Sequence, residues 1–219
     1  WGFLNVLEPY YKGGEDDYLL NSDKQLDLLN KRFIVFELDN IRDNKVLLPI
    51  VTIIIMETFI SKMRKLKGIR KMILIEECWK ALTSANMSSY IRYLFKTVRK
   101  FFGEAVVVTQ EVEDIISSSI VKGTIINNSD CKILLDQRKY VNKFDEIQAL
   151  LGLTDKERAQ ILSINMANNP SRRYKEVWIG LGGTQSAVYA TEVSLEEYVC
   201  YTTEETEKLE LMRLTEKLG

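Results

Sequence analysis

The sequence predicts an α/β fold with a mostly parallel sheet. Three apolar runs, at residues 71–75, 105–109 and 131–135, lack the alternation of apolar and polar side chains that marks a strand with one wet face. Stretches with helical spacing separate these runs, as in a sheet that helices cover on both sides. The chain has 219 residues, of which 46% are hydrophobic, and is therefore long enough to bury a substantial core.

Composition excludes several classes of protein. The 30 Lys and Arg residues balance 31 Asp and Glu residues, and the net charge of −1 argues against a protein that coats DNA. Histidine is absent, which excludes catalytic triads with histidine, His-ligated zinc and histidine proton relays. The three cysteines, Cys78, Cys131 and Cys200, are odd in number and far apart in the sequence, as expected for reduced thiols in a cytosolic protein.

Neither a membrane span nor a targeting signal is predicted. The longest apolar stretch, residues 46–60, is shorter than the ~20 residues that cross a bilayer, and we expect a buried helix there. The chain opens on Trp1 without an initiator Met, a basic leader or a signal-peptide core. We therefore expect it to be a piece of a longer protein.

The first part of the chain predicts a connecting segment and then the sheet core. Residues 1–30 are rich in turn formers and predict connecting structure, and residues 31–140 form the core. Residues 31–39 gather β-branched and aromatic side chains and predict a strand. Residues 47–67 predict a helix with a basic end, which Gly68 terminates.

Helices are also predicted between the three apolar runs. After a loop at residues 83–86, an amphipathic helix is expected from about Met87 to Phe102, with Gly103 ending it. A shorter helix is expected at residues 112–118, after the second run.

The remaining part, residues 141–219, predicts a small appendage of helices and a β-hairpin. Its expected elements are two helices, the two strands of the hairpin and a charged final helix, at residues 143–151, 155–163, 174–179, 185–192 and 204–218. Thr154 is expected to cap the second helix. The final helix is expected on the surface or against a partner.

Two acids follow the first of the three runs, where its strand should emerge from the core. The sequence M-I-L-I-E-E ends in Glu76 and Glu77, and ligands of parallel sheets bind at this carboxyl edge. Nucleotide hydrolysis needs one carboxylate that holds Mg²⁺, usually through water, and another that orients or deprotonates the attacking water. Glu76 could take the first role and Glu77 the second. The alternative is a buried strand that simply ends in solvated charge.

The next strand also ends in polar side chains. A-V-V-V-T-Q places Thr109 and Gln110 at what would be the adjacent position of the same sheet edge. A side-chain amide there can hydrogen-bond both a terminal phosphate and a lytic water. A polar strand end or helix cap is the alternative for each residue alone, but two neighbouring strands that end in this way favour a nucleotide site.

Two arginines are candidates for stabilising phosphate charge. Arg99 lies in a basic helix end, and could act within one subunit or across an interface between subunits. Arg138, in the Gln137-Arg138-Lys139 segment after the strand at residues 131–135, is a second and weaker candidate. For both, a solvated cation near a helix terminus is the alternative.

The phosphate-binding loop itself is absent from the sequence. No G-x-x-x-x-G-K-[ST] motif occurs in the 219 residues, and the glycines at residues 180–183 read as a turn. We therefore expect poor nucleotide affinity for this chain alone.

These motifs together resemble the ATPase domain of conjugative transfer proteins of the TraG and TraC type, the large type IV secretion ATPases of the VirB class. The resemblance rests on I-L-I-E-E-C-W-K-A-L, on a long helix ending R-K-F-F-G, and on V-V-V-T-Q-E-V-E-D-I. The opening L-E-P-Y-Y-K-G-G-E-D-D-Y-L-L-N and the run F-I-V-F-E-L-D resemble the stretch that precedes the Walker B strand, so the likeness extends from Leu7 to beyond Arg138. In style the sequence is most similar to TraG proteins of Bacteroides conjugative transposons.

The resemblance implies a RecA-like P-loop NTPase core that lacks its Walker A segment here. Members are motor ATPases that use ATP and Mg²⁺, assemble as ring-shaped, hexameric oligomers at the cytoplasmic face of the inner membrane, and energise pilus assembly or DNA transfer with other secretion components. The implied matches are Glu76 and Glu77 to the Walker B acids, Thr109 and Gln110 to the T-Q motif, and Arg99 with Lys100 to a basic segment before a glycine. Arg138 is matched by position only.

Two departures from the family leave other functions open. Glu stands at position 76 in place of the commoner Asp, and the missing Walker A loop implies a fragment that folds but does not turn over ATP. The missing loop and the charged final helix also fit a non-catalytic interaction module of a secretion or conjugation complex. DNA contact is a third hypothesis, because residues 62–71 hold six cations and no acid.

Overall fold

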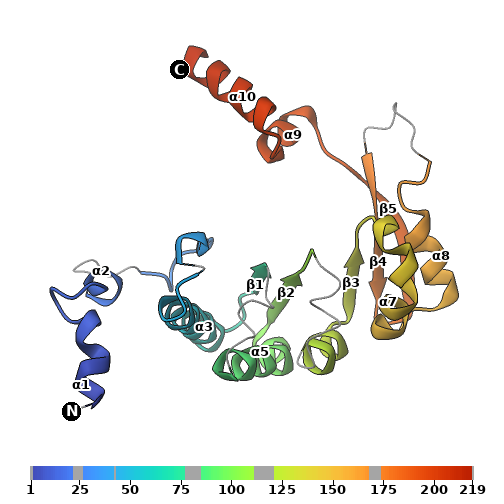
Figure 1. Cartoon of the computed structure of the whole chain (residues 1–219). Coiled ribbons are helices and arrows are strands. Elements are labelled where there is room, and N and C mark those ends of the chain that lie inside the picture. The colour runs from blue at the N-terminus through green and yellow to red at the C-terminus, as the bar shows by residue number, and fades with distance from the viewer. Residues whose placement is uncertain are drawn as a thin grey trace. The chain divides into compact units, whose positions relative to one another are not determined.

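The computed structural model describes residues 2–21, 27–41, 43–76, 85–110, 121–167 and 174–218, which form two compact units (Figure 1). The first unit contains Trp1–Ile73 and Val98–Glu104, and the second contains Leu74–Thr97 and Ala105–Gly219. The mixed α/β class predicted from the sequence is confirmed. The division into segments at residues 30 and 140 stays a prediction.

The first unit is mainly helical. Its helices are α1 (Gly2–Leu7), η1 (Glu8–Tyr10), α2 (Asp17–Leu20), η2 (Asp39–Ile41), α3 (Leu47–Lys65) and η3 (Val98–Phe101). The long helix α3 buries Met56, Ile60 and Met63, and it ends just before Gly68, whose φ of +74° few other residues tolerate. The predicted helix at residues 47–67 is therefore confirmed.

The strand predicted at residues 31–39 is wrong. The structure gives residues 31–38 no regular secondary structure, and Phe33 and Val35 are 86% and 71% exposed. A strand needs a hydrogen-bonded neighbour, and no described residue pairs with this segment as one. Instead, the Lys62 ammonium on α3 donates to the backbone carbonyl of Lys31 at 2.7 Å, which ties the segment to the helix.

The chain also contains a pair of neighbouring strands, β1 (Lys71–Glu76) and β2 (Gly103–Val108), which point the same way in Figure 1. The helix α5 (Ala85–Thr97) connects them, as predicted, but it ends earlier than residue 102. The turn is made by η3 and by Phe102, which has a φ of +57°, so Gly103 begins a strand and does not end a helix.

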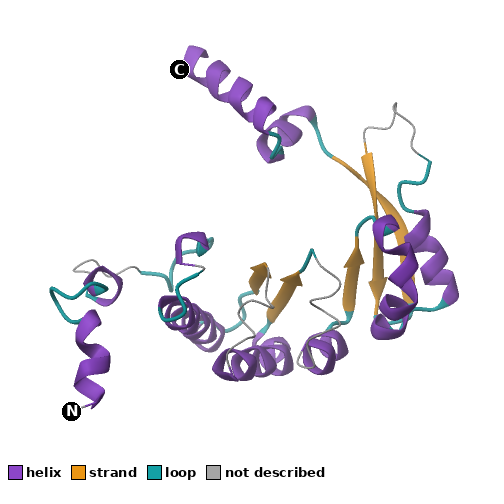
Figure 2. Ribbon diagram, in the orientation of Figure 1, coloured by secondary structure: helices purple, strands orange, loops and turns teal. Residues whose placement is uncertain are grey.

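The second unit also contains an antiparallel sheet. Its strands β3 (Cys131–Leu134), β4 (Tyr174–Leu181) and β5 (Gln185–Glu192) lie in that order, so the predicted strand at residues 131–135 and the predicted hairpin are confirmed (Figure 2). The π-helix η4 (Val121–Ile126) precedes β3. The helix predicted at residues 112–118 lies outside the described residues.

The core of the second unit lies between this sheet and two helices. The helices α7 (Phe144–Leu151) and α8 (Asp155–Ser163) contribute to a cluster of buried side chains: Leu134, Phe144, Ile147, Ile161, Ile164 and Trp178. Each such side chain stabilises the fold by about 1.5–3 kcal/mol relative to an exposed position. Thr154 caps α8 in a capping box with Glu157, as the sequence predicts.

The chain ends in two helices, α9 (Leu195–Tyr201) and α10 (Glu205–Leu218). Only α10 was predicted from the sequence. In the described part of the chain, no helix is both long and apolar enough to pass through a bilayer. Cys131 and Cys200 are free thiols, and Cys78 lies outside the described residues.

Candidate functional site

The candidate site begins where β1 and β2 end. Glu76 is the last residue of β1, and Thr109 and Gln110 directly follow β2. The two strands are neighbours with the same direction (Figure 1), so these residues end or follow them at one edge of the sheet. Glu76 and Gln110 are exposed and Thr109 is half-buried. Glu77 lies outside the described residues.

A tyrosine joins this edge to the segment that follows β3. The Tyr140 hydroxyl lies 3.3 Å from the backbone carbonyl oxygen of Gln110 and donates a hydrogen bond to it. The Tyr140 ring packs against the buried cluster of the second unit, and the Lys139 ammonium lies 4.6 Å from the ring centroid. The carboxyl end of β2 is therefore anchored to the short helix η5 (Arg138–Lys143).

Arg138 stands at the start of η5, where it pairs with Asp136. Its Nε donates to both carboxylate oxygens of Asp136 at 2.9 Å, and Nη2 donates to Oδ2. These hydrogen bonds from Arg138 lower the pKa of the Asp136 carboxyl from 3.8 to about 2. Hydrogen bonds and the charge of Asp136 raise the pKa of Arg138 in turn.

Asn165, two residues after the end of α8, also contacts this aspartate. Its side-chain amide donates to Asp136 Oδ2 at 3.5 Å, a long hydrogen bond. Asn165 also exchanges two hydrogen bonds with Glu176 of β4, of 2.8 Å and 3.0 Å. The tip of β3, the end of α8 and the start of β4 thus meet in one polar cluster.

Arg99 is positioned differently from the other candidates. It belongs to η3, which leads into the amino end of β2, whereas Gln110 follows the carboxyl end. A strand of six residues spans about 20 Å. Arg99 and Lys100 therefore do not share the sheet edge of Thr109 and Gln110.

Comparison with known proteins decides the family. A sequence profile described as the TraG P-loop domain matches residues 1–219, which is the whole chain. The chain belongs to the TraG P-loop family. Its curated relatives include the type IV secretion system protein virB4 of Bartonella quintana (strain Toulouse) and that of Bartonella henselae (strain Houston 1), each 27% identical over 173 residues. The match covers 79% of this chain and 21% of each relative, so the chain spans about a fifth of their length.

A solved structure supports the fold of this TraG-family chain. VirB4 of Thermoanaerobacter pseudethanolicus superposes with a TM-score of 0.57 at 21% identity, over 90% of this chain and 51% of that one. The likeness shows that the chain shares the fold of this VirB4 structure.

The residues at the strand ends fit a magnesium ion by their chemistry. Mg²⁺ prefers oxygen ligands and is usually held by one or two carboxylates, with water and substrate phosphates completing the shell. The exposed carboxylate of Glu76 can supply such a ligand. Among the described residues no group of three or more His, Cys, Asp or Glu side chains could hold a metal ion.

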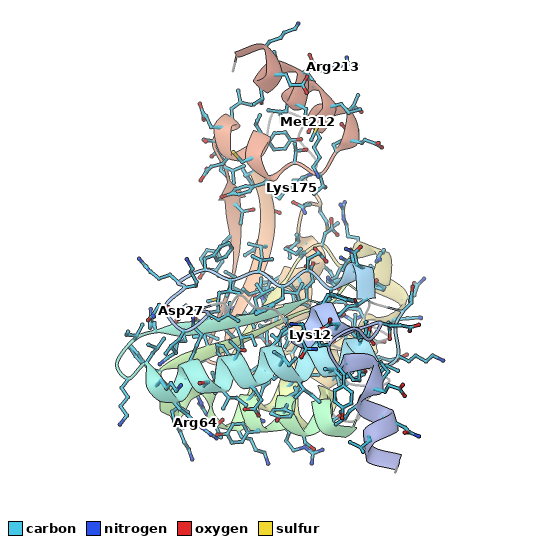
Figure 3. The ribbon with its side chains drawn as sticks, turned by 90° about the vertical axis from the view of Figure 1, so that its left-hand side faces the viewer. Lys12, Asp27, Arg64, Lys175, Met212 and Arg213 are labelled. Carbon is cyan, nitrogen blue, oxygen red and sulfur yellow. The ribbon has the colours of Figure 1, made fainter. Side chains whose placement is uncertain are left out.

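Of the six cations at residues 62–71, Lys62 and Lys71 donate hydrogen bonds to backbone carbonyls, and the other four are exposed. Lys71 is 9% exposed and donates to the carbonyl oxygen of Met63 at 3.5 Å, and Arg70 pairs with Glu104 at 3.8 Å. Lys62 holds the segment around Lys31, as described above. Arg64 lies on an exposed side of α3 (Figure 3).

Sequence reasoning missed three residues of this site. Asp136, two residues before Arg138, could have been found because an Asp-x-Arg spacing at a strand end allows local pairing. Tyr140 and Asn165 carry no local signal, since their partners lie 30 and 29 residues away in sequence.

Proposed function

We propose that this chain is the part of a type IV secretion ATPase that supplies the acidic, amide and arginine side chains of the nucleotide site. The family and the fold support this assignment. The phosphate-binding loop would come from a segment outside these 219 residues, because the chain has no Walker A motif.

One observation carries the proposal. Within the described residues, β2 is paired on one edge with β1, and β3 is paired on one edge with β4. The Tyr140–Gln110 hydrogen bond nevertheless holds the ends of β2 and of the β3 segment near each other. Two strands that flank a third lie about 10 Å apart, a span that a tyrosine and one hydrogen bond can bridge. A further strand, ending in the phosphate loop, would fit between β2 and β3.

In this proposal the strand ends divide the chemistry of hydrolysis. Glu76 would hold Mg²⁺ through water, and Glu77 would orient and deprotonate the attacking water. Thr109 and Gln110 contact the terminal phosphate and that water, and Arg138 stabilises phosphate charge. Arg99, at the other end of β2, would act on the nucleotide of a neighbouring copy in a hexameric ring.

The proposed setting follows from the relatives. Proteins named as VirB4 are components of type IV secretion systems. We expect the whole protein to work with other secretion components at the cytoplasmic face of the inner membrane, and to power conjugative DNA transfer. Direct DNA contact would fall to the exposed cations of α3, such as Arg64 and Lys65.

Steady-state ATP hydrolysis by the full-length protein tests the function. Glu77→Gln should lower kcat at least a hundredfold, because it removes the base that activates water. Glu104→Gln is the matched control: this exposed acid pairs with Arg70 at the opposite end of β2, so its kcat should not change. If the wild-type protein neither binds nor hydrolyses ATP, the non-catalytic interaction module is the correct function. If Glu77→Gln is as active as wild type, the assigned base is wrong.

Hydrogen exchange tests the proposed strand. The amides meant are those of β2 that do not face β1 and those of β3 that do not face β4. In the 219-residue chain these outer-edge amides should exchange quickly, and in the full-length protein they should become protected. Amides of β4, which is paired on both edges in this chain, serve as the internal reference. Equal exchange of the outer-edge amides in the two proteins would contradict the strand.

A further inference from the structure

We propose that Asp136 and Asn165 are positioning residues for Arg138, which turns the Nη1 edge of its guanidinium toward the phosphates of the nucleotide. This inference rests on the proposed ATPase function and adds to it the two residues that orient the Arg138 guanidinium. Sequence and family likeness indicated Arg138 by position alone, and neither indicated the two residues that hold it.

The first support is the way in which Arg138 is paired. Asp136 engages the Nε and Nη2 groups, and among the described residues it is the only partner of the guanidinium. The Nη1 group therefore keeps both of its N–H donors, in a side chain that is 49% exposed. A guanidinium held along one edge and open along another has its remaining donors in a fixed direction, as recognition of a planar or tetrahedral anion requires.

The second support is that Asp136 is itself held in place by a hydrogen bond. Asp136 is bonded by Asn165, which has a left-handed φ of +55° and is itself fixed by two hydrogen bonds to Glu176 of the central strand β4. Asparagine tolerates this backbone conformation better than most residues. The aspartate, which lies two residues after β3, is thus linked through Asn165 to β4 as well as paired with Arg138.

The third support is the location of the pair. Tyr140, two residues after Arg138, donates to the backbone of Gln110. A hydrogen bond therefore links η5, which begins with Arg138, to Gln110 at the end of β2, within the second unit. A phosphate that Gln110 contacts would lie within reach of that segment.

The charges predict an unusual kinetic signature. The Asp136 carboxylate offsets most of the charge of Arg138, so the pair adds little to long-range attraction of ATP and mainly sets direction. The orientation of the Arg138 N–H donors matters most in the transition state, because there they must point at the charged oxygens of the transferred phosphoryl group. Removing the aspartate charge should thus lower kcat while KM for ATP stays equal or falls.

Four variants of the full-length protein test this: Arg138→Ala, Asp136→Asn, the double variant and Asp145→Asn. The last is a matched control, because Asp145 forms another Asp–Arg pair of the same unit with Arg158. A displaced catalytic group costs up to about a hundredfold, so Asp136→Asn should lower kcat roughly 10- to 100-fold without raising KM. In the Arg138→Ala background Asp136→Asn should have no further effect, and Asp145→Asn should match wild type.

The inference is overturned if Asp136→Asn behaves like Asp145→Asn, or if its effect on kcat adds fully to that of Arg138→Ala. Asn165→Gly provides a second variant, since glycine keeps the left-handed backbone and removes the amide; it should lower kcat in the same direction as Asp136→Asn. These outcomes differ from failure of the function itself. If Glu77→Gln abolishes turnover but Asp136 and Arg138 prove dispensable, the ATPase function stands and only the positioning is wrong.

Discussion

Replacing Gly180 by alanine should destabilise the second unit through a clash with one buried side chain. Gly180 is a strand residue of β4, two positions after Trp178. A Cβ at Gly180 would lie 2.3 Å from Cη2 of the Trp178 ring, and 2.8 Å and 2.9 Å from Cζ2 and Cζ3. Ordinary contacts begin near 3.4 Å, so the ring would have to move by about an ångström or more.

The ring has no room for such a movement. Trp178 is 1% exposed, packs in the cluster with Phe144 and Ile161, and donates from Nε1 to the side-chain oxygen of Gln160 at 3.2 Å. Overpacking of this kind costs typically about 1–3 kcal/mol, and we expect the upper end because the neighbours are themselves fully buried. Leu134 of β3 lies opposite Trp178 in the sheet, so the displacement would also reach the strand that leads to Asp136.

Urea unfolding followed by tryptophan fluorescence and circular dichroism measures this cost. Gly123→Ala is the matched control, because a Cβ there meets nothing within 4 Å and its φ is not left-handed. This control should be neutral or slightly stabilising. In a double-mutant cycle Trp178→Phe, which removes the atoms that clash, should relieve much of the Gly180→Ala penalty. A Gly180→Ala variant as stable as Gly123→Ala, or costs that simply add in the cycle, would refute the reasoning.

Three further predictions follow from single contacts. The pKa of Asp136 is lowered to about 2, so its stabilisation is present above about pH 4 and is lost as the pH falls toward 2. The shift from 3.8 to about 2 corresponds to roughly 2.4 kcal/mol, which solvent screening of a side chain 30% exposed reduces to about 1 kcal/mol. In acid unfolding, Asp136→Asn should therefore lack this part of the pH dependence; an unchanged profile would contradict the pairing. Thr154→Ala should lower the free energy of unfolding by about 1 kcal/mol because it uncaps α8, which carries Ile161 of the core. Ser194→Ala removes the same motif from α9, which buries no residue, and should leave the main urea transition unchanged; equal losses would contradict this difference. Tyr140→Phe should cost about 1 kcal/mol and speed amide exchange in η5, because it removes the hydrogen bond to Gln110. Unchanged exchange in this helix would argue against the link.

The elements that the sequence predicts well are those with strong local signals. The capping box at Thr154 and Glu157 marks the start of α8, and the apolar run at residues 71–75 marks β1. The run at residues 31–39 is rich in the β-branched and aromatic residues that are typical of strands. Phe33 is nevertheless 86% exposed, and residues 31–38 form no regular secondary structure. A strand depends on a neighbour, and composition carries no information about whether one is present.

The site shows the same difference between local and distant information. Glu76, Thr109 and Gln110 could be placed together from the sequence, because parallel neighbouring strands end at one edge. The order of the chain also separates Arg99 from them, because Arg99 precedes β2 and Gln110 follows it, and η3 indeed leads into the amino end of β2. The contacts of Asn165 with Asp136 and Glu176 depend on the packing of α8 against β4, which no short motif encodes.

In the proposed function, the division of roles between this chain and a phosphate-binding loop would have a thermodynamic consequence. Backbone amides of a phosphate loop bind the phosphates in every state of the reaction, whereas a base, an amide and an aimed arginine act mainly as charge moves in the transition state. A chain that holds only the second set should bind nucleotide weakly even when every side chain is in place. Supplying the loop would then raise affinity and turnover together, while changes at Asp136 or Arg138 would act on turnover alone. The two sets of residues are thus distinguishable by kinetics, although they would surround the same phosphate.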